Sequence, residues 1–130
     1  MKINRRNFIK SSALFGSIMI LPSLATSKIK GANGRMRAAV VGWGGQGRST
    51  VNSLLNSGDA EIVALCDVDD VRSTGSYRDE AGKIMLSKLE KANRFRDYRV
   101  MLDKMDKEID GVCVCTPDHT HYPISARAIA

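Results

Sequence analysis

The first 37 residues of the chain contain no acidic side chain, although they carry eight lysine and arginine residues. Residues 38–130 carry twelve basic and fourteen acidic side chains, so their formal charge is −2. The net charge of +6 for the whole chain therefore belongs to its N-terminal segment. A basic face for nucleic acid has no support in the remaining residues, and we expect no nucleic-acid partner.

The sequence also lacks an apolar run of the usual transmembrane length. The apolar core of about residues 13–24 is shorter than the roughly 20 residues that span a bilayer. It follows Asn4–Lys10, a segment with paired arginines that resembles the motif of a bacterial twin-arginine (Tat) signal peptide. We predict a Tat signal peptide over residues 1–27 and a flexible linker over 28–36. An amphipathic or disordered N-terminal arm is the alternative.

Cysteine is scarce, and the three cysteines are Cys66, Cys113 and Cys115. Cys113 and Cys115 are two residues apart on a predicted strand and point to the same face, so no disulfide framework is expected. Both lie near His119 and His121, but the extended chain from Cys115 to His119 spans about 13 Å. Zinc ligands must come within about 2.0–2.3 Å of one point. We therefore predict buried thiols and no metal site.

A glycine-rich segment lies between two predicted elements. The apolar run Arg37–Val41 predicts a buried strand, and residues 48–57 predict a helix that ends at Gly58. A second strand, Ile62–Cys66, ends at Asp67, twenty residues beyond the last glycine of the segment. This order is the dinucleotide-binding βαβ fingerprint, and it predicts NAD binding. The candidate residues in the segment are Gly42, Trp43, Gly44, Gly45, Gln46 and Gly47.

Each residue type in the fingerprint has a chemical reason. Gly42 permits a tight turn, Gly44 lets the pyrophosphate approach the backbone, and Gly47 lets the helix pack closely on the sheet. Because Gly45 is a further glycine in the same segment, the assignment of the individual glycines to these roles is open. The helix N-terminus offers free N–H groups to the phosphates. Asp67 favours NAD, because its carboxylate can accept hydrogen bonds from the ribose hydroxyls and would repel a 2′-phosphate. NADP is the alternative, because Arg72 is nearby. A purely structural glycine loop is the other interpretation.

The remaining sequence alternates helices and strands. We expect a polar loop at 69–76, a helix at 77–93, a short strand at 95–97, a helix from Tyr98 through Met105, a central strand at 109–115 and a helix at 122–130. The methionines at helical spacing predict core packing. The fold class is α/β, a Rossmann-type doubly wound parallel sheet over residues 37–130, cut short before completion.

The segments Phe95–Tyr98 and Ile109–His121, together with Gly42–Gly47 and Asp67, resemble the N-terminal half of a Gfo/Idh/MocA-type oxidoreductase. This family includes glucose–fructose oxidoreductase and inositol dehydrogenases. The resemblance implies that Thr116, Pro117 and His121 line the dinucleotide site and that Asp118 helps to cap the following helix.

The same resemblance implies that the family's Glu-Lys-Pro motif and its second, sheet-rich α+β domain would follow Ala130. We therefore assign no catalytic residue, and we expect the chain alone to be inactive. The complete protein is expected to form a homo-oligomer.

Three functions are consistent with these features. The first is an exported NAD(P)-dependent oxidoreductase that acts on a sugar, a polyol or a related carbohydrate. The second is an NAD-dependent glycosidase of the same fold, and the third is a non-catalytic dinucleotide-binding module. Because the Tat translocon carries folded proteins, the cofactor would be loaded in the cytoplasm and travel with the protein to the periplasm or cell envelope.

Overall fold

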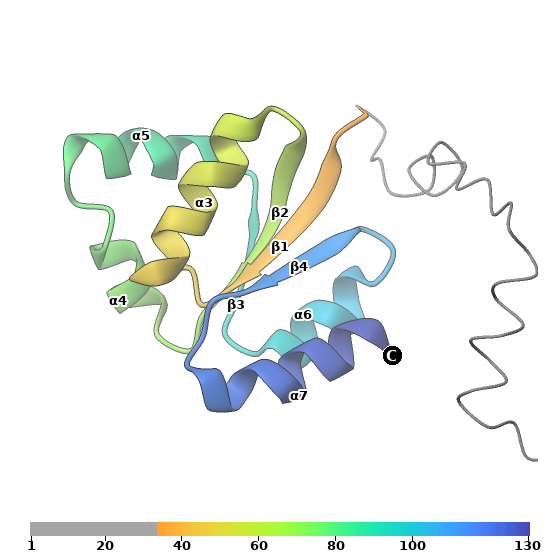
Figure 1. The fold of residues 1–130 in the computed structure, drawn as a ribbon. Coiled ribbons are helices and arrows are strands. Elements are labelled where there is room, and N and C mark those ends of the chain that lie inside the picture. The colour runs from red at the N-terminus through yellow and green to blue at the C-terminus, as the bar shows by residue number, and fades with distance from the viewer. Residues whose placement is uncertain (1–33) are drawn as a thin grey trace, which may run out of the picture.

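The structure is a computed structural model that describes residues 34–130 (Figure 1). The predicted signal peptide and most of the predicted linker lie outside these residues. Within residues 34–130, none of the helices combines the length and the apolar character that crossing a membrane requires.

The described residues form one four-stranded sheet in which every strand pair is parallel. The strands are β1 (Met36–Val41), β2 (Ala60–Cys66), β3 (Asn93–Phe95) and β4 (Gly111–Val114), and their spatial order is β3-β2-β1-β4. The chain reverses its direction of winding between β1 and β4, which is where doubly wound sheets bind their ligands. The predicted α/β Rossmann-type fold is confirmed.

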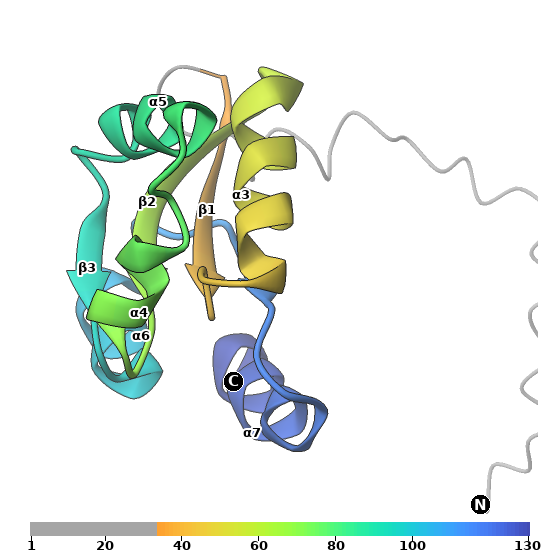
Figure 2. The same ribbon diagram turned by 90° about the vertical axis from the view of Figure 1, so that its left-hand side faces the viewer.

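Helices cover both faces of this sheet (Figures 1 and 2). Helices α3 (Gln46–Ser57) and α5 (Glu80–Lys88) lie on one face, and α6 (Tyr98–Met105) and α7 (Asp118–Ile129) lie on the other. The short helix α4 (Asp70–Gly75) lies near the carboxyl end of β2. This two-sided cover explains why the strand sequences are apolar on both faces.

The core consists of two clusters, one on each face. Along β1, Val40 belongs to the first cluster, whereas Ala39 and Val41 belong to the second, as the alternation of a strand requires. The predicted packing role of the methionines is confirmed because Met85, Met101 and Met105 are buried in these clusters. The first cluster contains Val40, Trp43, Val51, Ile62, Leu65, Tyr77, Met85, Leu89 and Ala92.

Two predictions between β2 and β3 were wrong. The expected polar loop at 69–76 contains α4, which begins after Asp69, whose carboxylate accepts the Arg72 N–H at 3.0 Å. The expected helix at 77–93 is limited to α5. The buried face of α5 also differs from the predicted one, because Ile84 is 59% exposed whereas Gly82 is buried. A Cβ on Gly82 would lie 2.6 Å from the Tyr77 backbone, so only glycine permits this approach.

Smaller differences concern the later elements. Strand β3 is Asn93–Phe95 rather than 95–97, and α7 begins at Asp118, four residues before the predicted start. The prediction of a central strand at 109–115 was wrong for the described sheet, where β4 pairs only with β1 and its residues are half-buried.

An ion pair fixes β4 beside β1 at the amino ends of the strands. The Asp110 carboxylate accepts hydrogen bonds from the Arg37 main-chain N–H (2.9 Å), Nε (3.0 Å) and Nη2 (2.8 Å). The hydrogen bonds from Arg37 lower the pKa of Asp110 below its usual range. This contact helps to set the register that brings the opposite, carboxyl ends of β1 and β4 together.

Candidate functional site: a dinucleotide cavity

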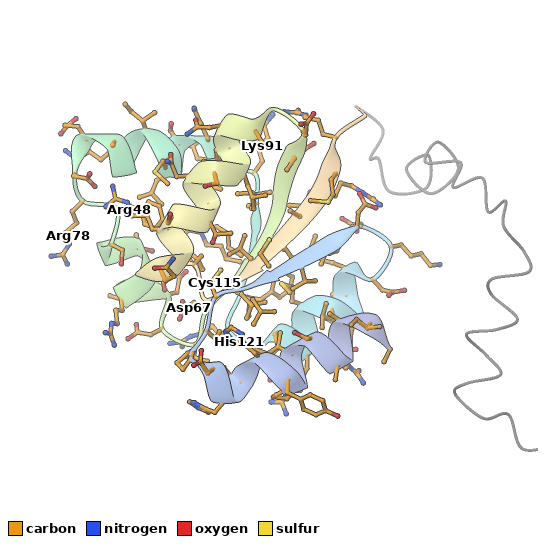
Figure 3. The ribbon with its side chains drawn as sticks, viewed as in Figure 1. Arg48, Asp67, Arg78, Lys91, Cys115 and His121 are labelled. Carbon is orange, nitrogen blue, oxygen red and sulfur yellow. The ribbon has the colours of Figure 1, made fainter. Side chains whose placement is uncertain are left out.

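A cavity of about 1160 Å³ opens at the carboxyl ends of the strands. Figure 3 shows Asp67, Cys115 and His121 gathered in this region, where Asp67 follows β2, Cys115 follows β4 and His121 lies in α7. Of the ten predicted cofactor-binding residues, the cavity brings together eight: Gly42, Gly44, Gly45, Gln46, Asp67, Thr116, Pro117 and His121. Trp43 and Gly47 do not line it.

Gly42 begins the turn that leaves β1. Its φ angle is 80°, a conformation that favours glycine, and a Cβ there would lie 2.9 Å from both the Cys115 carbonyl oxygen and Thr116 Cγ2. Its N–H also donates to the Cys66 carbonyl at 2.8 Å. Gly42 therefore allows the turn, the end of β2 and the β4–α7 loop to meet at one point.

Gly47 has the packing role that its spacing predicts. It is buried in the first turn of α3, and a Cβ there would overlap the Gly42 carbonyl oxygen and lie 2.8 Å from its carbon. The absence of a side chain lets α3 begin directly against the turn. Gly47 thus shapes the site without lining the cavity.

The role predicted for Gly44 fits Gly45 better. A Cβ on Gly44 would point to α4, at 2.9 Å from Ser73 Oγ and 3.0 Å from Ser73 Cα, so this glycine makes room for α4. Gly45 has a φ of 49° and open space where a Cβ would lie. It is also the N-cap of α3, so the open backbone beside the cavity belongs to Gly45.

The N-terminus of α3 suits an anion. Among residues 34–130, the main-chain N–H of Gln46 has no hydrogen-bond partner, and the Gly45 N–H makes only a long 3.4 Å contact with Ser76 Oγ. The first turn of α3 also contains no acidic residue. These donors and the helix dipole together favour a phosphate group.

The assignment of Trp43 as a cofactor contact was wrong for its side chain. Trp43 is fully buried, and its ring packs against Tyr77 with 5.3 Å between the ring centroids. The Arg94 guanidinium covers the Trp43 ring at 5.1 Å. The Trp43 side chain therefore belongs to the core, and only its backbone takes part in the turn.

Asp67 stands at the end of β2 on the cavity wall. One of its carboxylate oxygens accepts the Asp69 N–H at 3.0 Å, which orients the side chain, and its own N–H donates to the Phe95 carbonyl. Arg72, on which the alternative of NADP binding depends, lines the same cavity.

Sequence analysis did not identify several further lining residues, among them Thr50, Ser73, Ser76, Arg96 and Tyr98. Arg96 and Tyr98 follow β3, so their place after a parallel strand could have indicated this edge.

The β4–α7 loop closes another side of the cavity. His121 Nε2 lies 2.6 Å from the Thr116 carbonyl oxygen, and because a carbonyl only accepts, this nitrogen carries the proton. The Thr120 hydroxyl lies 2.7 Å from Thr116 Oγ1, and Pro117 occupies the N-cap position of α7. The predicted capping by Asp118 was wrong, because Asp118 lies in the first turn and makes no side-chain cap bond.

The family model described as "Oxidoreductase family, NAD-binding Rossmann fold", the Gfo/Idh/MocA family, matches residues 36–130. The chain belongs to this family. Its cofactor is accordingly a nicotinamide dinucleotide.

A protein of Stenotrophomonas maltophilia named "Glycosyl hydrolase family 109 protein" is 30% identical to this Gfo/Idh/MocA chain over 131 residues. The similarity covers 98% of the chain but only 27% of that protein. The chain thus spans about a quarter of the length of the curated relative that it matches.

The cysteines of this Gfo/Idh/MocA domain are packing groups. Cys66 is buried, and burial raises the pKa of its thiol to about 12, so the thiol remains protonated. Burial also raises the pKa of Cys113. The prediction of buried thiols was wrong for Cys113 and Cys115, which are half-buried, and Cys115 lies just after β4. Both pack against the same core cluster, as their spacing predicts. Within residues 34–130, no three His, Cys, Asp or Glu side chains are placed to hold a metal ion.

Proposed function

We propose that this chain is the cofactor-binding part of a longer, exported NAD-dependent enzyme that acts on a carbohydrate. The observation that carries the proposal is the meeting of the glycine turn, Asp67 and the Thr116–His121 loop around one cavity of about 1160 Å³. Ligand sites commonly measure about 300–1,000 Å³, so the cavity is large enough for an extended ligand such as a dinucleotide.

Different residues of the chain would bind different parts of the dinucleotide. The N–H groups of Gly45 and Gln46 donate to the pyrophosphate, and the Asp67 carboxylate accepts hydrogen bonds from the adenosine ribose. His121 keeps its ring oriented through the Thr116 carbonyl. The bound cofactor supplies a hydride acceptor, and the chain positions it next to the substrate. The residues that exchange a proton with the substrate would follow Ala130.

Two chemistries fit this part of the enzyme. The family description supports an oxidoreductase that oxidises a carbinol carbon of a sugar or polyol. The name of the Stenotrophomonas relative favours a glycosidase. In an NAD-dependent glycosidase, oxidation would be transient, and the aglycone would be eliminated before the cofactor is restored. Because both chemistries need a firmly held dinucleotide, we expect the cofactor-binding part of an oxidoreductase and that of a glycosidase to have similar structures.

Enzyme assays on the product of the complete reading frame separate these chemistries. An oxidoreductase is expected to reduce its NAD with a free sugar or polyol, seen as absorbance of the reduced nicotinamide. A glycosidase is expected to release nitrophenol from a nitrophenyl glycoside with no net change in NAD. If neither reaction occurs with a broad panel of sugars and glycosides, although NAD is bound, the chain serves as a non-catalytic module.

We also propose export by the Tat pathway to the periplasm or cell envelope, on the strength of Asn4–Lys10 and the apolar stretch that follows. Replacing Arg5 and Arg6 with lysine keeps the charge and removes the paired arginines. We expect the wild-type protein in the periplasmic fraction and the double variant in the cytoplasm. Equal export of both proteins would contradict the proposal.

A further inference from the structure

Tyr77 reaches the glycine turn from outside the dinucleotide fingerprint. It lies between α4 and α5, thirty-four residues after Trp43, and its side chain is 1% exposed. Its hydroxyl donates a hydrogen bond of 2.8 Å to the Trp43 carbonyl oxygen. Burial raises the pKa of Tyr77 to about 12, so the hydroxyl keeps its proton.

This hydrogen bond fixes the peptide group between Trp43 and Gly44. In a trans peptide the C=O and the N–H point in opposite directions. Because Tyr77 holds the Trp43 carbonyl toward the core, the Gly44 N–H points away from Tyr77. Gly44 itself lines the cavity. The Tyr77 hydroxyl therefore sets the orientation of a backbone donor in the turn.

Neighbouring contacts hold Tyr77 in this position. Arg48, from the first turn of α3, donates to the Ser76 carbonyl at 2.7 Å, and its guanidinium lies over the Tyr77 ring at 5.4 Å from the centroid. Arg48 also pairs with Asp79 at 2.7 Å. Figure 3 shows Arg48 extending from α3 in this direction. The two ends of the glycine turn, Trp43 and the start of α3, are thus tied to the same short segment.

We propose that Tyr77 is a positioning residue for dinucleotide binding, whose hydroxyl holds the glycine turn in the orientation that receives the pyrophosphate. This inference rests on the dinucleotide binding in the proposed function but not on the carbohydrate chemistry. A buried carbonyl oxygen that loses its only hydrogen-bond donor keeps the full desolvation penalty of burial. Without the hydroxyl, the Trp43 peptide is therefore expected to rotate toward other donors.

The test substitutes Tyr77→Phe in the full protein, which keeps the ring against Trp43 and removes only the hydroxyl. We expect the Kd for ADP-ribose and for NAD, measured by isothermal titration calorimetry, to rise about tenfold, equivalent to about 1.4 kcal/mol. The Kd for adenosine, which has no pyrophosphate, is expected to stay within about twofold. A structural role alone would not separate these ligands.

Two controls accompany this variant. Tyr122→Phe removes a hydroxyl from a side chain that is 83% exposed and should change neither stability nor any Kd. Leu89→Ala, in the same core cluster as Tyr77, should lower the unfolding temperature but leave the Kd values of the folded protein unchanged.

Two results would overturn the role of Tyr77: unchanged affinity of Tyr77→Phe for ADP-ribose, or an equal loss for ADP-ribose and adenosine. If the wild-type protein itself binds no dinucleotide, the proposed function fails as well, so the two failures are distinguishable.

Discussion

Substituting Gly47→Ala is expected to raise the Kd for NAD at least about 100-fold, equivalent to about 2.7 kcal/mol, and to destabilise the domain. The added methyl group would overlap the Gly42 carbonyl oxygen and lie 2.8 Å from its carbon. Both atoms are backbone, so no side-chain rotation relieves the contact. Either α3 moves off the sheet or the turn changes shape, and each movement displaces the N–H groups of Gly45 and Gln46.

Helix propensity opposes this effect but is too small to offset it. Alanine is favoured over glycine in a helix by about 1 kcal/mol. Overpacking of a tight core typically costs about 1–3 kcal/mol even where side chains can adjust, and here the obstacle is main chain. The balance therefore favours net destabilisation, which thermal unfolding followed by circular dichroism will measure beside the calorimetric Kd.

Gly111→Ala is the matched control for this prediction. Gly111 lies in β4, and a Cβ there would meet Met36 Sδ at 3.5 Å, an ordinary van der Waals distance. Stability should change by no more than about 0.5 kcal/mol, and NAD affinity should be unaffected. Wild-type affinity in the Gly47→Ala protein would show that the close approach of α3 is not required for binding.

Strand β1 and helix α6 were predictable because their signals are local. Strand β1 is an apolar run stopped by Gly42, and α6 carries Tyr98, Met101, Leu102 and Met105 at helical spacing. Both elements lie within one residue of their predicted bounds. The position of Asp67 was also predictable, since a residue directly after a parallel strand must stand at the ligand edge of the sheet.

Helix α4 was missed because its causes are not local. Its six residues are too few for an apolar period, and Val71 within it is 80% exposed. Its position depends on Asp69 as the cap and on the bare backbone of Gly44, against which Ser73 packs. The second of these contacts joins residues 29 positions apart, and no pattern in the sequence of 69–76 reveals it.

The wrong side-chain role for Trp43 has a similar origin. The fingerprint specifies the glycines but not the direction in which the intervening side chain points. That direction follows from the φ of 80° at Gly42 and from the space beside Tyr77. Tyr77 itself was predicted to begin a helix, so its hydrogen bond to the turn could not be anticipated. Contacts between the fingerprint and α4–α5 are tertiary, and they complete the site.

The largest expected change in specificity concerns Asp67. Asp67→Asn keeps the size of the side chain and an oxygen that can accept the Asp69 N–H, now at 3.0 Å, but it removes the negative charge. We expect the Kd for NAD to rise about tenfold, because a hydrogen bond to a charged group is worth about 1.5–3 kcal/mol and one to a neutral group about 0.5–1.5.

The Kd for NADP is expected to fall at the same time, because the 2′-phosphate no longer meets a like charge and Arg72 on the same cavity wall can pair with it. The preference for NAD over NADP should thus shift about 100-fold, equivalent to about 2.7 kcal/mol, in calorimetric titrations at one fixed ionic strength. Asp69→Asn is the control, since it removes a charge from the same wall while asparagine still caps α4. A similar shift in that variant would assign the preference to the overall charge of the cavity, and tighter binding of NADP by the wild-type protein would contradict the role of Asp67.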